Sequence, residues 1–300
     1  MIDGQLVKGH GTANDFVLLH DPHGEHALDP AGVRTLADRH TGIGGDGVIR
    51  VIRSAALGEE AGDVAHDGGA EWFMDYRNAD GSIAEMCGNG VRVFAHYLRT
   101  YDLVQSQSFA VGTRAGIKHV TVIPDPLGGD EPWYKVDMGK WQLPGGGEAF
   151  DATVETPGVR VARPGLTVDM GNPHTVVALA HAEELEAAKL HELPHVEPVP
   201  PAGTNVEYIV IEPDNDPTTG TLRMRVHERG VGETHACGTG ACASALAAYV
   251  WAGRGPQAPT TWTVHQPGGA VRIDITGETV ALSGPAVITY EVTPRDLPVL

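Results

Sequence analysis

Short apolar runs dominate the 300-residue chain and predict a protein built mainly of β-strands. The runs are rich in β-branched and aromatic residues, and most of them end at glycine, proline or another turn residue. Two neighbouring runs turn at Thr276, Gly277 and Glu278, which is typical of a β-hairpin. The other runs that predict strands lie at 16–20, 47–53, 71–77, 117–123, 134–138, 166–170, 205–211, 221–228 and 261–265.

Helical patterns are few. Asp29 and Pro30 form an N-cap and first-turn pair, and the helix that they open is expected to end near His40. Two further stretches carry apolar residues at positions i, i+3, i+4 and i+7, and each directly follows a cysteine in a Gly-x-Gly turn. The further helices are expected at 181–191, 91–98 and 242–249.

The two halves of the chain share landmarks in the same order. Asn78 lies nine residues before Cys87, and Glu228 lies nine residues before Cys237. A third matching pair, each an asparagine in a glycine-containing turn beside an apolar run, is Asn14 and Asn172. The pattern indicates a duplication, and we expect two β-rich lobes that each wrap around a central helix.

The predicted fold class is α+β, with two pseudo-symmetric lobes that each form a curled, mostly antiparallel sheet. We place the N-terminal lobe at 1–140 and the C-terminal lobe at 141–283. The glycine- and proline-rich stretch 143–158 is expected to join them. Residues 54–70 are expected to form a flexible loop between two strands.

Composition and charge narrow the possible partners. Hydrophobic residues make up 41% of the chain and charged residues 20%, as in an ordinary globular protein. Lys and Arg number 21 against 39 Asp and Glu, and this negative field would repel nucleic acids and anionic membranes. We expect no secretory signal, since residues 1–16 lack its basic and apolar regions, and no membrane span. A cytoplasmic protein is therefore expected.

The chain has three cysteines, Cys87, Cys237 and Cys242, which is a poor basis for a disulfide framework. A Gly-x-Gly turn at the start of a helix presents several backbone N–H groups and the positive end of the helix dipole. Such a turn can bind a carboxylate or phosphate, and it is expected to lower the pKa of a neighbouring thiol. Two such turns could grip one anion with a thiol on either side of it.

This arrangement suits the inversion of a carbon next to a carboxylate. One thiolate would remove a proton from one face of the carbon, and one thiol would deliver a proton to the other face. The backbone N–H groups would stabilise the charge that develops on the carboxylate oxygens.

Other interpretations of the cysteines remain open. A cysteine near a helix is often a small buried hydrophobe, and we assign that role to Cys242 on the apolar helix face. A zinc site made of Cys87, Cys237, His174 and His235 is conceivable, although the sequence has no closely spaced cysteine pair to support it. The histidines expected on the surface are His66, His227 and His235.

Several motifs, in order along nearly the whole chain, resemble those of the diaminopimelate epimerase family. They read GHGTANDF, TGIGGDG, NADGSIAEMCGNGVR, MGNPH, GTNVEY and ERGVGETHACGTGACA. The resemblance implies a cofactor-independent epimerase, without metal, that interconverts LL- and meso-2,6-diaminoheptanedioate for lysine and peptidoglycan synthesis. It also implies a homodimer whose last segment, 284–300, returns to the N-terminal lobe as a strand.

The resemblance assigns roles to the residues that match the motifs. Cys87 and Cys237 would be the two acid/base residues, and His174 and Glu228 would support them, with Glu228 meeting the reacting ammonium group. Backbone N–H groups would bind the reacting carboxylate, from Gly88, Asn89, Gly238 and Thr239. The remaining substrate contacts would come from Asn14, Asn78, Asn172, Asn205 and Arg229. From spacing alone, the asparagines could equally serve as turn residues.

One position departs from the family pattern, and two rival functions remain. Many members have glutamine where this chain has Gly47. A proline racemase or hydroxyproline epimerase would share the fold and the thiols, but that family typically has histidine at the position of Asn89. A thiol redox sensor is the third reading, although no peroxide-reacting motif supports it.

Overall fold

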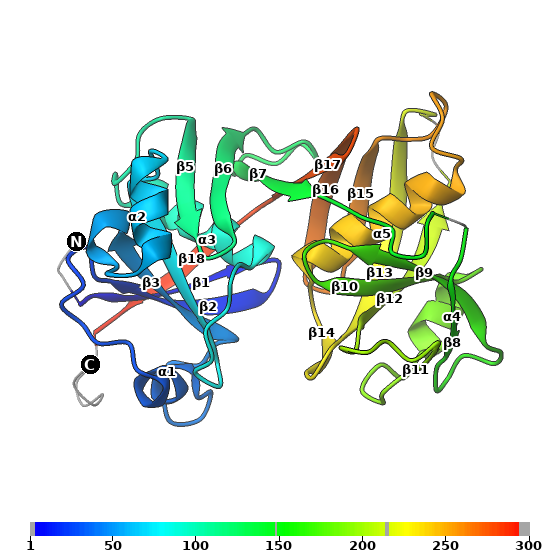
Figure 1. Ribbon diagram of the computed structural model, residues 1–300, viewed down its shortest axis with the longest axis horizontal. Coiled ribbons are helices and arrows are strands. Elements are labelled where there is room, and N and C mark those ends of the chain that lie inside the picture. Colours follow the sequence, from blue (N-terminus) through cyan, green and yellow to red (C-terminus); the bar gives the residue numbers. More distant parts are fainter. Residues whose placement is uncertain (1–3, 148, 214–215, 294–300) are drawn as a thin grey trace. The chain divides into compact units, whose positions relative to one another are not determined.

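The computed structural model describes residues 4–147, 149–213 and 216–293. The chain divides into two compact units, which we describe separately (Figure 1). Unit 1 comprises Met1–Asp137 with Gly284–Leu300, and unit 2 comprises Met138–Ser283. Residue 148 of the expected connection and residues 294–300 of the expected returning segment lie outside the described residues.

Unit 1 is a mixed sheet in which the order of strands is β18-β1-β2-β3-β4-β5-β6-β7. The pairs β2–β3 and β4–β5 are parallel, and the other pairs are antiparallel. Its strands are β1 Leu6–Gly11, β2 Asn14–His20, β3 Gly47–Arg53, β4 Trp72–Asn78, β5 Ser108–Thr113, β6 Gly116–Ile123, β7 Trp133–Lys140 and β18 Val287–Val292. Its helices are α1 Pro30–Ala37, η1 Ser54–Ala56, α2 Glu60–Asp67 and α3 Gly88–Thr100. In Figure 1, β18 (red) lies beside β1 (blue).

Unit 2 repeats this topology with the order β8-β9-β10-β12-β13-β15-β16-β17. The two parallel pairs, β10–β12 and β13–β15, fall at the same places as in unit 1. Its strands are β8 Ala152–Glu155, β9 Arg163–Asp169, β10 Pro173–Ala178, β11 His195–Glu197, β12 Asn205–Glu212, β13 Thr219–Glu228, β14 Gly232–Thr234, β15 Thr261–Gln266, β16 Gly269–Thr276 and β17 Thr279–Gly284. Its helices are α4 Ala182–Ala187 and α5 Gly238–Trp251.

The strand register makes the two units comparable residue by residue. Phe16 pairs with Gly47 in unit 1, and His174 pairs with Asn205 in unit 2, so the paired residues are 31 positions apart in both. Strand order, strand direction and register therefore repeat, and the predicted pseudo-symmetric α+β fold is confirmed.

Each sheet packs against its long helix. Helix α3 contacts β1, β2, β3, β4 and β18, and α5 contacts β9, β10, β12, β13, β15 and β16. Almost every residue of α5 from Gly238 to Val250 is buried. This explains why its sequence is rich in alanine and glycine, because small side chains allow a helix to be covered on all sides.

The stretch 54–70 is not the loop that we predicted, because it contains η1 and α2. Its helical face uses small residues that the apolar pattern underweights. Ala65 packs in a cluster with Ile52, Leu57 and Phe73. A Cβ atom at Gly62 would lie 2.6 Å from the Ser54 carbonyl oxygen, so α2 depends on glycine to approach the turn beside it.

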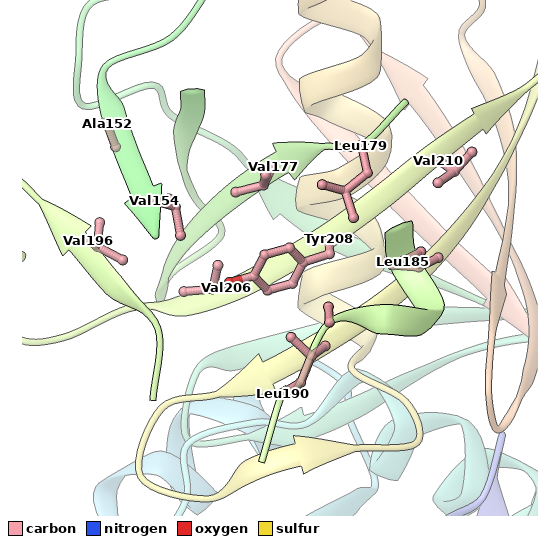
Figure 2. Packing of buried hydrophobic residues seen from close by; sticks show 11 residues of the cluster. Ala152, Val154, Val177, Leu179, Leu185, Leu190, Val196, Val206, Tyr208 and Val210 are labelled. Carbon is pink, nitrogen blue, oxygen red and sulfur yellow. The ribbon is translucent and has the colours of Figure 1, made fainter. Parts of the chain in front are cut away.

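A hydrophobic cluster forms one part of the unit 2 core (Figure 2). The ring of Tyr208 on β12 lies at its centre, and its hydroxyl is hydrogen-bonded to the Thr156 hydroxyl. The other buried members are Ala152, Val154, Val177, Leu179, Leu185, Ala188, Leu190, Val196, Val206 and Val210. Burial of these side chains holds α4 and β8 against the sheet.

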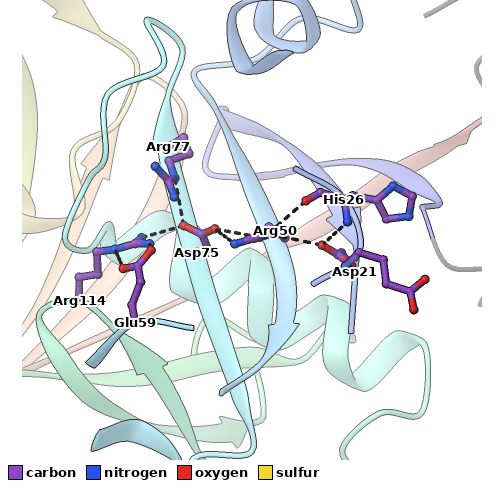
Figure 3. A network of polar contacts seen from close by, with 8 residues as sticks. Asp21, His26, Arg50, Glu59, Asp75, Arg77 and Arg114 are labelled. Atoms are coloured by element: carbon purple, nitrogen blue, oxygen red, sulfur yellow. Dashed lines mark hydrogen bonds and ion pairs between the residues drawn. The ribbon is translucent and has the colours of Figure 1, made fainter. Parts of the chain in front are cut away.

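Unit 1 instead contains a buried ion-pair network on β3 and β4 (Figure 3). Asp75 is fully buried and pairs with Arg50, Arg77 and Arg114 at 2.8, 3.0 and 2.7 Å. Burial alone would raise the pKa of Asp75, but the charges of these arginines outweigh it and lower the pKa. Arg114 also pairs with Glu59 just before α2, so the network ties that helix to the sheet.

Candidate active site

The two cysteines of the predicted site cap the two long helices in the same way. Cys87 is the N-cap of α3 with φ −141° and ψ 120°, and Cys237 is the N-cap of α5 with φ −127° and ψ 115°. Each sulfur accepts a hydrogen bond from the N–H of the third helical residue, at 3.4 Å from Gly90 and 3.3 Å from Gly240. The predicted helix starts are confirmed, and the sulfur takes the place of the usual N-cap oxygen.

This cap leaves the first helical N–H groups in position for an anion. Gly88 and Asn89 open α3, and Gly238 and Thr239 open α5. The first N–H groups of any α-helix have no acceptor within the helix. The geometry therefore suits the carboxylate-binding role expected of these four residues, and that role stays a prediction.

In unit 1, side-chain hydrogen bonds connect Cys87 with a buried arginine. The Cys87 thiol donates to Asn14 Oδ1 at 3.6 Å, and Asn89 Nδ2 donates to the same oxygen at 3.2 Å. Arg92 Nη2 donates to Asn89 Oδ1 at 2.6 Å, and Arg92 is fully buried. We call Asn14, Cys87, Asn89 and Arg92 the N half-site. Its chain of contacts ends in a cation that the sequence did not lead us to expect.

Charged residues next to Asn14 were also missed. Asn14 Nδ2 donates to Asp46 Oδ2 at 2.6 Å, and Asp15 pairs with Lys8 at 2.6 Å and with Arg39 at 2.7 Å. Burial would raise the pKa of Asp15, but hydrogen bonds from Arg39 and Lys8 and their charges lower it. These contacts fix the turn that carries Asn14.

Two other positions of unit 1 bear on the predicted substrate contacts. Asn78 Nδ2 donates to Ser82 Oγ at 3.0 Å, so this side chain stabilises its own turn. Gly47 lies beside it in the sheet, and a Cβ atom there would lie 2.4 Å from the Arg77 carbonyl oxygen and 2.6 Å from the Tyr76 ring. The space that a side chain at Gly47 would need is filled by Tyr76.

In unit 2, the corresponding contacts lead to a buried carboxylate. Cys237 Sγ lies 3.6 Å from Thr239 Oγ1, and Asn172 Nδ2 donates to that hydroxyl at 3.4 Å. His174 Nε2 lies 3.0 Å from Asn172 Oδ1, and His174 Nδ1 lies 2.7 Å from Glu207 Oε1. We call Asn172, His174, Glu207, Cys237 and Thr239 the C half-site. The sequence led us to every member except Glu207.

The remaining predicted residues of unit 2 lie at the ends of β12 and β13. Asn205 Oδ1 accepts from the Arg229 backbone N–H at 3.0 Å, and Asn205 Nδ2 donates to the Pro173 carbonyl at 3.0 Å. The Arg229 guanidinium donates to the Ala202 carbonyl at 2.8 Å. Glu228 Oε1 accepts from the Thr234 hydroxyl. These contacts hold the ends of both strands in place.

The pKa of the Cys237 thiol lies well above its ordinary value, so the expectation of a lowered pKa is wrong for this residue. Burial is the largest cause, because water does not solvate the thiolate, and the charges of Glu228 and Glu207 add to it. Hydrogen bonds from Thr239 and Gly240 act in the opposite direction without outweighing it. Cys237 is therefore held as a neutral thiol at neutral pH.

Gln266 is a further contact that the sequence did not suggest. Its Oε1 accepts a hydrogen bond from the Cys237 backbone N–H at 2.8 Å. The side chain comes from the end of β15, 29 residues away, and such a partner leaves no local signal in the sequence.

Two of the three histidines expected on the surface are exposed. His227 is buried, not on the surface, and its Nδ1 lies 2.8 Å from the Leu190 carbonyl oxygen, while His66 and His235 are exposed. Cys242 is buried in α5, as expected of a packing residue.

Among the described residues, no cluster of three or more histidine, cysteine, aspartate and glutamate side chains could hold a metal ion. No described helix has the length and apolar character needed to cross a membrane.

Comparison with known proteins places the chain in a family. The sequence matches the family described as Diaminopimelate epimerase over residues 6–144 and 166–289. It is 49% identical to a diaminopimelate epimerase of Mycolicibacterium paratuberculosis, over 95% of this chain and 94% of the relative.

Two solved structures share the fold at low sequence identity. A phenazine biosynthesis protein of the PhzF family from Bacillus anthracis has a TM-score of 0.63 and 16% identity, over 98% of this chain and 100% of that chain. A probable proline racemase from Agrobacterium radiobacter has a TM-score of 0.61 and 12% identity, over 97% of this chain and 92% of that chain. At such identities the likeness concerns the fold alone. The family match and the close relative are decisive, and this chain belongs to the diaminopimelate epimerase family.

Proposed function

We propose that this chain epimerises diaminopimelate, interconverting the LL and meso forms of 2,6-diaminoheptanedioate in lysine and peptidoglycan precursor synthesis. Membership of the family supports the reaction, and the 49% identity over 95% of the chain supports the substrate. The proposal includes a cytoplasmic homodimer that uses no cofactor and binds neither nucleic acid nor membrane.

The structural observation that carries the mechanism is the matched pair of cysteine caps. Cys87 and Cys237 each place a sulfur at the start of a helix whose first N–H groups suit a carboxylate. One cysteine acts as the thiolate and takes the α-proton, while the other gives its thiol proton to the opposite face of the carbon. The carbon is inverted, and the two cysteines exchange protonation states.

Charge development in this reaction explains the need for the helix starts. Removal of the α-proton leaves a pair of electrons that spreads onto the carboxylate oxygens. The N–H groups of Gly88, Asn89, Gly238 and Thr239 bind those oxygens more tightly as their charge grows. Preformed donors stabilise the transition state more than the substrate, which is the condition for catalysis.

The remaining residues bind and orient the substrate. Glu228 receives the reacting ammonium group. His174 supports the proton transfers. The distal, non-reacting end of the substrate contacts Asn78, Asn172, Asn205 and Arg229, and Asn14 makes a further contact with the substrate. Three of these asparagines (14, 172 and 205) are already hydrogen-bonded to other parts of the protein, which preorganises them for binding.

Deuterium incorporation tests this function directly. The reduced protein is incubated with LL-diaminopimelate in D₂O, and we expect the meso isomer to form with deuterium at the inverted α-carbon. Turnover of proline or 4-hydroxyproline in place of diaminopimelate would favour the racemase alternative. Absence of α-proton exchange with all of these amino acids would remove the two-thiol mechanism.

A further inference from the structure

A buried histidine and a buried glutamate lie behind Cys237. Both side chains are fully shielded from solvent, and His174 Nδ1 lies 2.7 Å from Glu207 Oε1. The other carboxylate oxygen of Glu207, Oε2, has no hydrogen-bond partner among the described residues. A buried carboxylate oxygen without a donor costs free energy, so this placement calls for an explanation beyond packing.

The equivalent positions of unit 1 show that the fold does not require these two side chains. By the repeated register, Phe16 of unit 1 is equivalent to His174 of unit 2, and Ile49 is equivalent to Glu207. A Cβ atom at Gly90 would lie 3.5 Å from the Ile49 side chain, and one at the matching Gly240 would lie 2.7 Å from Glu207 Oε1. Ile49 and Glu207 therefore occupy equivalent places, each beneath the start of the long helix in its own unit. In unit 1 that point is apolar, and in unit 2 it carries a carboxylate.

Glu207 lies close to the thiol, because the same Cβ position at Gly240 that is 2.7 Å from Glu207 Oε1 is 3.2 Å from Cys237 Sγ. After burial, the charges of Glu228 on β13 and Glu207 on β12 are the next causes that raise the pKa of Cys237. On the other elements that face this point, His174 of β10 contacts Glu207, and Gln266 of β15 and Thr239 of α5 are neutral. Glu228 has an assigned role at the substrate ammonium group, whereas Glu207 has none.

We propose that Glu207 is a positioning residue of the C half-site, which orients His174 and whose charge acts together with burial and Glu228 to keep Cys237 in the thiol form in the resting protein. The inference rests on the proposed two-thiol function, in which one cysteine must start protonated. Glu207 holds the His174 ring, whose other nitrogen contacts Asn172, and Asn172 in turn donates to Thr239 beside the sulfur. Unit 1, with Ile49 and Phe16, has no corresponding pair, so the two cysteines are made unequal before substrate arrives.

The test is the pH dependence of alkylation at Cys237 in the full-length protein without substrate. Wild type and Glu207→Gln are reacted with iodoacetamide between pH 6 and 11, and peptide mass spectrometry gives the rate at each cysteine. Loss of the charge is expected to lower the midpoint for Cys237 by about one pH unit, which raises its thiolate population about tenfold below both midpoints. Glutamine still offers His174 an acceptor, so a purely structural role would leave the midpoint unchanged.

Controls separate this effect from general changes of charge or stability. Glu212→Gln removes a charge from the same strand at a partly exposed position and should leave the Cys237 midpoint unchanged. Cys87 in the same sample should alkylate as in wild type when Glu207 is replaced. Glu207→Asp keeps the charge and should retain the wild-type midpoint. Glu207→Met also removes the charge at similar length and replaces the glutamine variant if that variant does not fold.

An unchanged Cys237 midpoint in the folded, uncharged variants would overturn the proposal, and so would an equal shift at Cys87. The readout needs no turnover, so its outcome is independent of the deuterium assay. If the protein epimerises diaminopimelate but the Cys237 midpoint does not shift, only the proposed role of Glu207 is overturned. If the midpoint shifts but the protein does not epimerise diaminopimelate, only the proposed reaction is overturned.

Discussion

The two units carry their buried charges on opposite faces of equivalent strands. By register, Ile49 and Arg50 of β3 correspond to Glu207 and Tyr208 of β12. In unit 1 the residue beneath the helix is apolar, and its neighbour on the other face joins the ion network of Asp75 (Figure 3). In unit 2 the residue beneath the helix is a carboxylate, and its neighbour is the tyrosine of the apolar cluster (Figure 2). Successive strand residues point to opposite faces, so the pattern is inverted.

The inverted pattern shows which features the repeated fold keeps in both units and which features differ between them. Cysteine caps, glycine at the third helical position and strand register are the same in both units. The polarity of the interior differs between the units, because either face of the sheet can hold buried charged residues or an apolar cluster. We infer that charge on the helix side acts on the thiol, whereas charge on the far side stabilises the unit.

The largest expected effect comes from breaking the feature that the units share. Cys87→Ser and Cys237→Ser should each lower the rate of epimerisation by about 10²- to 10⁴-fold, because the serine hydroxyl is too weak an acid to replace the thiol. Steady-state conversion of LL to meso substrate measures this.

The matched control is Cys242→Ser, at a buried position of α5 away from the cap. It should cost stability while leaving the turnover number close to that of wild type. A wild-type rate from either serine variant of the caps would remove that cysteine from the mechanism and end the functional equivalence of the two units.

A second pair of substitutions compares the far faces of the sheets. Asp75→Asn leaves three partly buried arginines without their common, fully buried carboxylate and should destabilise unit 1 by about 3–5 kcal/mol. Tyr208→Phe removes only the hydroxyl bonded to Thr156 and should destabilise unit 2 by about 1 kcal/mol. Native-state hydrogen exchange reports each unit separately. Equal losses in the two units would mean that the ion network contributes no more than one neutral hydrogen bond.

A third pair concerns Gly47 and its counterpart Asn205. Gly47→Gln restores the residue that many family members have, yet its Cβ would overlap the Tyr76 ring and the Arg77 carbonyl. We expect the free energy of unfolding to fall by about 1–3 kcal/mol, measured by thermal unfolding, and the KM for diaminopimelate not to fall. Asn205→Gly removes two hydrogen bonds at the equivalent place and should cost about 1–2 kcal/mol and raise KM. A lower KM in the Gly47→Gln variant would show that Tyr76 moves aside.

The sequence predicted those parts of the fold whose signals are local. A cysteine followed by Gly-x-Gly and a 3.6-residue apolar period fixed the starts of α3 and α5, because cap and periodicity lie within a few residues of each other. Helix α2 was missed because its packed face consists of Gly62 and Ala65, which carry little hydrophobic signal.

The interior charges of the site were missed for a different reason. Glu207 and His174 are far apart in sequence and meet only because β10 and β12 pair in parallel. Arg92 lies within a buried helix face, where the apolar period gives no warning of a cation. The burial of a charged residue depends on partners brought by topology, and so does the sign of the change in the pKa of Cys237.

The smallest expected effect is a pH dependence of stability that originates in Cys237. Its pKa is raised in the folded protein, while the unfolded thiol titrates near the reference value of about 8.5. Below that pH both states hold the proton, so the contribution of this group is complete. Above it only the unfolded state ionises, and the free energy of unfolding falls by up to about 1.4 kcal/mol per pH unit until the folded thiol ionises too. Urea titrations with reductant measure the free energy of unfolding at pH 7.5 and at pH 9.5. Between these pH values, the free energy of unfolding should fall by about 1 kcal/mol more in wild type than in Cys237→Ser. Parallel curves would mean that the thiol titrates normally in the fold, and the inequality between the two half-sites would then have to come from the substrate.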